Sequence, residues 1–569
     1  MKRFTALFLT AAMLFALCAC GSGGASSGQN SASMKDFAQQ NMDQIEQVAR
    51  ENNITSLEDY PFDATRRSTA NTDERYPSVS FAQSFSPTEW QPYNLQDAAK
   101  TFGKYMIYEF LLDRVGADEY ENRLAKDWYH EDGTHTVVEI YDNIYDSDGN
   151  HITASDVVFS YKLNVNSGYA QNFEYYSDVE QIDTYKVRFT WTEPFGTLNA
   201  TYYLLANVAI VSEKAYSEHD FAKDPVGTGP YKLTKFVTDS YCVFEVNENY
   251  WQEEALRSKY AKQNVQTIHV DFVTDSSMRM IMLQNGTSIC NPYLSVSDIE
   301  SLLVGGEYEG QFNLTTSYNT QSTTLIPNMS EGSIMSDINM RLACWYAIDS
   351  AALVAALGAN ANSACVVDAA ASIGDYQDSW NDIESYQTQY SIEKSKEYQE
   401  KAGYNGETIK ILAGTFTTKK MTAQVIAEML RQAGINTEIQ VVEYVVQQQT
   451  LDDPNNWDIY TDSQLDNDYT INRLRNVYSV SVAGAYGDKN KSYIYDKTFE
   501  DMISKCAAPG GYSVEATEDV LHYIIDNAYG YGTSYITSYV AWNKDIATTA
   551  CPYGNTTTPL LNCCDYYLD

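Results

Sequence analysis

The chain has 569 residues, which exceeds the size of one hydrophobic core, so two or three lobes are expected. Its 38 lysines and arginines against 76 aspartates and glutamates give a formal net charge of −38. This acidity argues against binding to nucleic acid and against electrostatic docking on anionic lipid. An apolar content of 44% is ordinary for a soluble chain that buries sizeable cores.

The first 19 residues have the pattern of an export signal. Lys2 and Arg3 precede an apolar run that is too short to suit a stable transmembrane span. Cys20 follows a small residue, as in a bacterial lipobox, and a Gly/Ser-rich stretch comes after it. We expect residues 1–19 to be a lipoprotein signal peptide, Cys20 to be lipidated, and residues 20–58 to be a tether and spacer containing a polar helix. An ordinary secretory signal is the alternative.

Eight further cysteines follow Cys20: Cys242, Cys290, Cys344, Cys365, Cys506, Cys551, Cys563 and Cys564. An even number in an exported chain permits disulfides, but the sequence cannot give their connectivity. None has the CxxC spacing of a zinc site. Buried thiols are the alternative, and the sequence favours it slightly.

The first half of the chain predicts strands and helices with distinct local motifs. A strand at 78–82 leads to a loop that contains Trp90 and Tyr93, and residues 97–112 have helical periodicity. Thr153 is expected to cap a helix, with Asp156 as its capping-box partner. The sequence motifs, in chain order, are Tyr108-Glu109 near the end of the first helix, Arg123 to Trp128, Asp148 to Tyr161, Asp224 to Phe236, and Asn247 to Trp251.

The stretch Asp224 to Phe236, DPVGTGPYKLTKF, predicts a rigid turn that feeds a half-buried strand. Pro225 and Pro230 fix φ and remove two amide donors. Gly227 and Gly229 are expected to adopt backbone angles that a side chain would forbid. The stretch contains no nucleophile, metal-ligand cluster or phosphate-binding loop, so we expect its role to be architectural.

Together these segments resemble the family 5 solute-binding proteins, the extracytoplasmic receptors of ABC importers for peptides, nickel and some oligosaccharides. The resemblance covers nearly everything from Pro77 onward. It implies a two-lobed α/β fold of the periplasmic-binding-protein type (type II, large cluster) with an extra subdomain in the first lobe. We expect residues 59–290 and 509–569 in the first lobe, its subdomain at about 97–190, residues 291–508 in the second lobe, and hinges near Cys290 and Pro509.

The second half predicts another α/β lobe, since strands at 409–412, 434–441 and 458–460 alternate with helices. Arg341 and Asp349 are expected on one helix, which they would orient through local ion pairs.

No catalytic constellation and no metal site is expected. The six histidines are scattered, and neither HExxH, GxSxG nor a P-loop is present. The resemblance implies ligand contacts in the loop after the strand at 458–460. Asp466 matches best the aspartate that pairs with a peptide amine, Asp468 is the alternate, and Tyr469 stands where the family pattern leads to proline. Three aromatic residues are candidates for the cleft walls, with core packing as the alternative for each: Trp90, Tyr93 and Trp457.

The expected function is capture of a solute, an oligopeptide first and an oligosaccharide second, for delivery to an ABC permease and its ATPase. The protein would be a monomer on the outer face of the bacterial membrane, held there by its lipid, with no cofactor and no nucleic-acid partner. Two alternatives of another class are a surface-anchored glycan hydrolase and a sensor that reuses the fold without transport.

Overall fold

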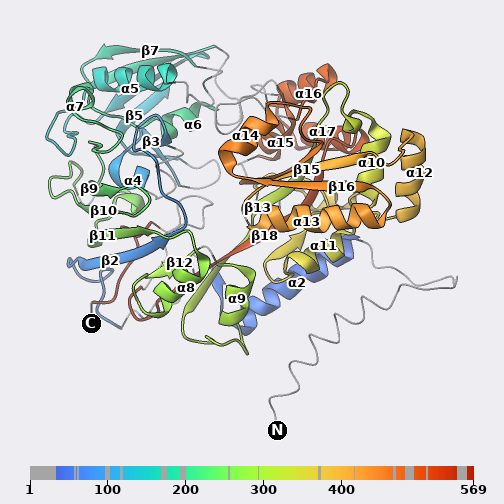
Figure 1. Cartoon of the computed structure of the whole chain (residues 1–569). Helices are drawn as coiled ribbons and strands as arrows, with labels where there is room; N and C mark the ends of the chain where they lie inside the picture. The colour runs from blue at the N-terminus through green and yellow to red at the C-terminus, as the bar shows by residue number, and fades with distance from the viewer. Residues whose placement is uncertain are drawn as a thin grey trace, which may run out of the picture.

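The structure is a computed structural model that describes residues 34–568. It leaves out residues 57–58, 61–62, 64, 96–102, 116–119, 168–172, 174–175, 193–199, 254–256, 293, 370–372, 416, 466–468, 481–491, 508–510 and 548–559. Two lobes lie side by side and are connected by long strands that pass from one to the other (Figure 1).

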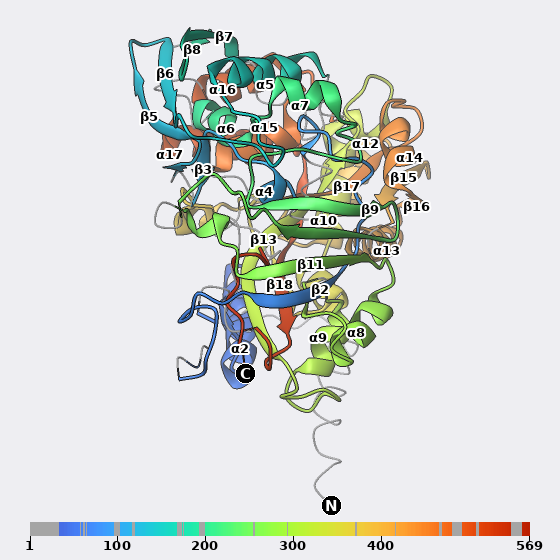
Figure 2. The ribbon, with the colours of Figure 1, turned by 90° about the vertical axis from the view of Figure 1, so that its left-hand side faces the viewer.

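The first lobe is built on a four-stranded sheet in the order β2-β11-β10-β9, whose strands run across the face seen in Figure 2. Apolar residues on one face of each strand, such as Phe81, Phe244 and Val270, are completely buried in the largest core of this lobe. The strands are β2 (Tyr76–Gln83), β9 (Tyr231–Val237), β10 (Tyr241–Val246) and β11 (Val265–Phe272), and the helices are α4 (Gly103–Ile107), α7 (Glu213–Glu218), α8 (Ser276–Gln284) and the 3-10 turn η2 (Lys259–Ala261).

A subdomain with its own core extends the first lobe, as the sequence predicts. Helix α5 packs on a four-stranded antiparallel sheet in the order β5-β6-β8-β7. Thr153 and Asp156 form the expected capping box at the start of α5. The elements are β3 (Leu112–Arg114), β4 (Tyr120–Asn122), β5 (Ala125–His130), β6 (His135–Ile140), α5 (Ala154–Asn166), β7 (Tyr176–Asp183), β8 (Lys186–Trp191) and α6 (Ala200–Asn207).

The turn before β9 has the architectural role that the sequence predicts, but its glycines serve a different purpose. Neither Gly227 nor Gly229 has a positive φ. Instead, a Cβ at Gly227 would stand 2.0 Å from the carbonyl oxygen of Ile107, and one at Gly229 would stand 2.2 Å from that of Met106. The prediction of unusual backbone angles is therefore wrong, because close approach to the backbone of α4 is what requires glycine here.

Three sequence motifs of the first lobe converge on one buried carboxylate. Glu109 accepts hydrogen bonds from Arg123 Nε at 2.6 Å, from the Tyr250 hydroxyl at 2.5 Å and from Trp251 Nε1 at 2.6 Å. Arg123 also pairs with Asp113, its Nη1 lying 3.1 Å from Oδ2. Since an unpaired buried charge is costly, this network requires α4, the subdomain and the end of β10 to hold fixed positions.

The second lobe surrounds a mixed sheet whose strands are buried on both faces. Neighbouring residues point to different cores: Ile411 and Ile459 lie in one core, Leu412 and Tyr460 in the other. The strands are β13 (Asn313–Pro327), β14 (Asn362–Ala364), β15 (Thr408–Gly414), β16 (Asn436–Val442), β17 (Ile459–Leu465) and β18 (Tyr531–Trp542), and β1 (Thr55–Ser56) and β12 (Cys290–Asn291) add to this sheet. The helices and 3-10 turns are α9 (Val296–Leu302), η3 (Ile334–Ser336), α10 (Ile338–Tyr346), α11 (Ser350–Leu357), η4 (Asp378–Asp382), α12 (Ile392–Ala402), α13 (Thr417–Gln432), α14 (Tyr444–Leu451), α15 (Thr470–Tyr478), α16 (Lys497–Ala507) and α17 (Val514–Asp526).

The chain returns to the first lobe later than the sequence suggests. Pro509 itself lies outside the described residues. Helix α17 buries Val520, Leu521 and Ile524 in a core of the second lobe, because its apolar face packs against α15 and α16. The crossing is β18 itself, which begins at Tyr531 in a second-lobe core and ends at Trp542 in the first-lobe core. Residues 511–530 thus belong with the second lobe.

Part of the expected tether is a folded element. Helix α2 (Met34–Glu51) is present as predicted, but it buries Ile45 and places Ala49 in a cluster beside the crossing strands. Strand β1 pairs with β13. A spacer description therefore fails for residues 34–56, because the helix has an apolar face that the polar composition of the segment conceals.

Arg341 orients its helix differently from the prediction. It lies on α10, whereas Asp349 is the N-cap of α11. The guanidinium donates to the carbonyl oxygens of Met335, Ser336 and Asn527 at 2.7–2.9 Å. Burial lowers the pKa of Arg341 to about 10.

Among the cysteines that the structure describes, all seven after Cys20 are buried: Cys242, Cys290, Cys344, Cys365, Cys506, Cys563 and Cys564. Within the same residues, no single helix is both long and apolar enough to cross a membrane, and α10 and α11 reach that hydropathy only as a pair bent by 61°.

We predict that Gly229→Ala destabilises the protein by about 3 kcal/mol, because the added methyl group overlaps the Met106 carbonyl. Urea unfolding followed by circular dichroism measures the change. Gly374→Ala is the matched control, since a Cβ at Gly374 meets nothing within 4 Å. Equal stability of the two variants would show that the turn can relax away from α4.

We also predict that Arg123→Met destabilises the protein by roughly 3–5 kcal/mol, because it leaves Glu109 and Asp113 buried without their cation. The control is Arg188→Met, which removes a more exposed pairing with Glu131 and should change stability far less, because solvent screens that pair. Thermal unfolding measures both, and a loss at Arg123 no larger than that at Arg188 would contradict a central role for the network.

Candidate functional site

The carboxyl end of β17 is directed at the first lobe. Strand β15 runs parallel to both β16 and β17, so their carboxyl ends share one edge of the sheet. Leu465, the last residue of β17, pairs with Gln321 of β13. From there β13 continues to Asn313, which pairs with Trp542 in the first-lobe core. The loop that begins after Leu465 therefore starts on the side of the second lobe that faces the first.

A charged pair marks this edge. Lys419 of α13 lies with its Nζ 3.1 Å from Oδ1 of Asp462 on β17, and both side chains are largely buried. The pair shows that a cation and a carboxylate are both held at the carboxyl edge of the sheet, and Asp462 lies shortly before the predicted ligand loop in the chain.

The chain re-enters the described structure at Tyr469, where a buried carboxylate fixes it. Asp375 accepts hydrogen bonds from the Thr470 amide at 2.9 Å, the Thr470 hydroxyl at 2.8 Å and the Tyr512 hydroxyl at 2.9 Å. The Tyr469 and Tyr512 rings meet edge to face, with centroids 4.9 Å apart. Asp466 and Asp468 lie outside the described residues. Of the loop prediction, only Tyr469 can be placed, half-buried at the start of α15.

An ion pair anchors α15 from within. Arg473 Nη2 lies 2.5 Å from Oδ1 of Asp368, and both side chains are almost fully buried. The Tyr478 hydroxyl donates to Oδ2 of Asp368 at 2.7 Å. Burial raises the pKa of Tyr478, and the Asp368 charge raises it further. The sequence reasoning missed this network because its two charges are 105 residues apart and neither lies in a motif.

Two of the three aromatic residues predicted for the cleft walls lie in the cores of the lobes. Trp90 is 0% exposed in the first-lobe core, where it meets Phe236 and Phe244 edge to face. Trp457 is 1% exposed in a second-lobe core against Tyr460. Both indoles thus pack as core residues, which is the alternative that the sequence left open, because each ring lies among apolar side chains of its own lobe. Neither ring presents a surface to a solute.

Tyr93 is half-buried in the loop that follows Trp90, where it hydrogen-bonds the Tyr216 side chain. It remains a candidate for contact with a solute.

A buried lysine lies near the same loop. Lys104 of α4 is 7% exposed, and the described residues offer it no carboxylate; its ammonium lies over the Tyr105 ring, 4.6 Å from the centroid. One turn later, the Tyr108 hydroxyl donates to the Trp90 carbonyl at 2.5 Å, which places this face of α4 at the Trp90 loop. Burial lowers the pKa of Lys104 to about 8. Sequence reasoning missed it because a lysine in an amphipathic helix is usually solvated.

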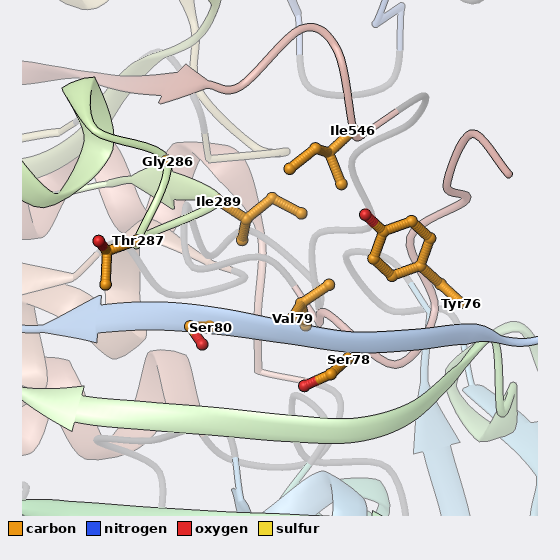
Figure 3. Close-up of a pocket in the computed structure, with 8 residues that line it drawn as sticks. All are labelled: Tyr76, Ser78, Val79, Ser80, Gly286, Thr287, Ile289 and Ile546. Atoms are coloured by element: carbon orange, nitrogen blue, oxygen red, sulfur yellow. The ribbon is translucent and has the colours of Figure 1, made fainter. Parts of the chain in front are cut away.

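A small cavity lies at the junction of β2 and the segment before β12 (Figure 3). Tyr76, Val79, Ile289 and Ile546 contribute apolar walls, and Ser78, Ser80 and Thr287 contribute hydroxyl groups. Its volume of about 180 Å³ is below the range typical of ligand sites. It also lies away from the carboxyl edge of the second lobe, so we do not assign the solute site to it.

Within the described part of the chain, no group of three or more His, Cys, Asp or Glu side chains is placed to hold a metal ion. Of the three histidines nearest to carboxylates, His219 is the best coordinated, with Asp148 and Asp224 each 2.9 Å away. This arrangement links two surface turns and has no nucleophile beside it.

A family model for the bacterial extracellular solute-binding proteins, family 5, matches residues 119–480, more than half of the chain. The chain belongs to this family. The chain is 24% identical over 481 residues to the dipeptide-binding protein of Escherichia coli, and the alignment covers 76% of this chain and 83% of the relative. It is 24% identical over 405 residues to the oligopeptide-binding protein AppA of Bacillus subtilis, covering 65% and 70%.

Solved structures confirm the two-lobed fold of this family 5 protein. The DppA protein of Helicobacter pylori in complex with the peptide STSA superposes with a TM-score of 0.73 at 20% identity, covering 87% of this chain and 99% of that one. AppA of Bacillus subtilis in complex with a nonapeptide gives a TM-score of 0.72 at 17% identity, covering 87% and 100%. NikA of Staphylococcus aureus with Ni(L-His)₂ gives 0.69 at 17% identity, covering 86% and 100%. Family members are binding proteins found outside the cytoplasm.

We predict that Lys104→Met stabilises the unliganded protein at pH 7. Lowering a lysine pKa from 10.5 to about 8 corresponds to roughly 3 kcal/mol of unfavourable burial, which methionine avoids. Because the unfolded chain binds this proton more tightly, the wild type gains stability as pH rises from 8 towards 10.5. The difference between variant and wild type should therefore be largest below pH 8 and shrink above it.

Thermal unfolding at several pH values measures this difference. Lys497→Met is the matched control, because Lys497 is exposed and its ion pair with Asp501 lies at the surface. A Lys104→Met protein that is less stable than the wild type at pH 7 would contradict an uncompensated buried charge.

Proposed function

We propose that this family 5 protein is a lipid-anchored receptor that captures an oligopeptide between its lobes and delivers it to an ABC permease and ATPase. The observation that carries the proposal is the placement of the described residues on either side of 466–468. Leu465 ends β17 at the edge of the second lobe that faces the first, and Asp375 holds the Thr470 amide where the described chain resumes. Peptide-binding relatives and peptide complexes among the related structures support the same ligand class.

The two lobes would supply opposite charges to the solute. On the second lobe, Asp466 is proposed to pair with the peptide amine, with Asp468 as the alternate. On the first lobe, Lys104 lies near the Trp90 loop with no carboxylate partner among the described residues, which suits a ligand carboxylate. An oligopeptide carries both charges, whereas a neutral oligosaccharide carries neither. Burial of Trp90 and Trp457 also removes two of the aromatic residues that favoured a sugar.

Closure of the cleft would follow from these contacts. A solute that touches both lobes binds the closed state more tightly than the open one, and this difference in affinity shifts the population towards closure. Cys20 is proposed to hold the mature protein at the membrane, on the basis of the lipobox pattern.

Thermal-shift screening and calorimetry with defined peptides test the proposal. We predict that peptides bind the wild type, and that N-acetylation of the peptide or Asp466→Asn weakens binding at least about tenfold, which corresponds to about 1.4 kcal/mol. Asp526→Asn, at an exposed position on α17, is the control and should bind as the wild type does.

Peptide affinity that survives Asp466→Asn and Asp468→Asn would contradict the amine-pairing role but leave the receptor function intact. Binding of oligosaccharides without peptides would favour the sugar receptor. Turnover of any glycan would contradict a protein that only binds its solute. Normal peptide uptake in a strain that lacks this protein would favour a sensor.

A further inference from the structure

Residues 34–56, formed by α2, its C-terminal turn and β1, lie against the strands that connect the two lobes. In Figure 1, α2 runs along the lower edge of the molecule between α11 of the second lobe and α9 near the crossing. We call residues 34–56 the N-terminal splint. They precede the first strand of the first lobe, β2, and the family model does not include them.

The two crossing strands pair with two register shifts, and the wider one lies between the lobes. Strands β13 and β18 pair regularly up to Ser317 and Ser538 and resume at Gln321 and Ile536; the second shift lies between Thr323 and Thr324, within the second lobe. Between these pairs, residues 318–320 of β13 face only Thr537 of β18. Extra residues interrupt the ladder and let strands bend. β1 and β12 flank one side of this bulge, and β14 and β17 flank the other, so a bend here changes the angle between the lobes.

The first half of the splint binds the second lobe. Asn41 is 4% exposed, and its side-chain amide uses both ends: Nδ2 donates to the Ala359 carbonyl and Oδ1 accepts from the Ala364 amide, each at 3.2 Å. Ala364 belongs to β14, which pairs with β18 on the second-lobe side of the bulge. Lys35 adds an exposed ion pair with Asp382, at 2.5 Å.

The second half of the splint binds the other side of the bulge. Thr55 and Ser56 of β1 pair with Thr315 and Thr316 of β13. Asn52 Oδ1 accepts from the Val304 amide, directly after α9, at 2.5 Å. Between the two halves, Ala49 shares a core with Leu283 of α8 and Tyr539 of β18, and its burial ties the helix to both elements. Ile45 on the same helix is fully buried as well.

The bulge itself faces the splint. Burial raises the pKa of the bulge residue Tyr318, and the charges of Glu46 and Arg50 on α2 act on it in opposite directions. These two side chains are one helical turn apart, so the middle of α2 lies over the irregular point of the ladder.

We propose that the N-terminal splint restrains the hinge. It limits the range of angles between the two lobes that the unliganded protein samples. Bending at the bulge moves Ala364 relative to Thr315, and the splint is bonded to both. A wider opening must therefore break either the Asn41 hydrogen bonds or the β1 pairing. The splint begins at Met34, beside the second lobe. The lipid tether expected at Cys20 would therefore be connected to the rest of the protein through the splint.

Inter-lobe distances measured without ligand test the proposal. Nitroxide labels at exposed Ser177 of β7 and Lys396 of α12, introduced through unnatural amino acids to spare the native cysteines, report the lobe separation by double electron–electron resonance. Asn41→Leu removes both hydrogen bonds while keeping the shape of the side chain. We expect its distance distribution to become broader and to shift to longer values.

Gln44→Leu is the matched control, because it removes an amide from an exposed position on the same helix. Asn41→Asp is a second variant, which keeps the acceptor for Ala364 but replaces the donor to Ala359 with a carboxylate oxygen that repels that carbonyl, and it should shift the distribution in the same direction. A distribution like that of the wild type in a folded Asn41→Leu or Asn41→Asp protein would overturn the proposal. So would an equal shift in Gln44→Leu.

Discussion

The antiparallel pairing of β13 with β18 is the constraint on which the rest of the structure depends. Strand β18 contributes to the cores of both lobes and β13 pairs with it along most of its length, so their register decides which edge of each lobe faces the other. Pairing of Gln321 with Leu465 on the next strand then places the carboxyl edge of the second sheet towards the first lobe. The position of Leu465, the last described residue before the proposed ligand residues, thus follows from the backbone hydrogen bonds of β13.

Each lobe stabilises its own interior with a buried ion pair that joins distant segments. Glu109 and Arg123 connect α4, the subdomain and the end of β10 in the first lobe. Asp368 and Arg473 connect the region after β14 with α15 in the second. Such pairs contribute little net stability compared with apolar packing, but breaking one is costly, so they hold the joined segments in one arrangement.

We propose that opposite local charges, rather than aromatic rings, distinguish the two sides of the candidate site. The chain as a whole is strongly acidic, yet the first lobe keeps a buried lysine near the Trp90 loop without a carboxylate among the described residues. Burying an ammonium in this way lowers stability, and such residues are commonly found where a ligand supplies the missing charge. Trp90 and Trp457, in contrast, contribute to packing inside the cores of their lobes.

The sequence by itself determined the elements and the family. Local signals such as the Thr153 capping box and the alternation of residues 186–191 depend only on neighbours in the chain, and the structure has both as predicted. The motifs around Glu109, Arg123 and Trp251 indicated the family without revealing that they meet at one carboxylate. Only the tertiary structure decided that Trp90 and Trp457 are core residues, that α17 belongs to the second lobe, and that α2 packs at the hinge. Those outcomes depend on which apolar faces meet across hundreds of residues, and burial of that kind leaves no local pattern in the chain.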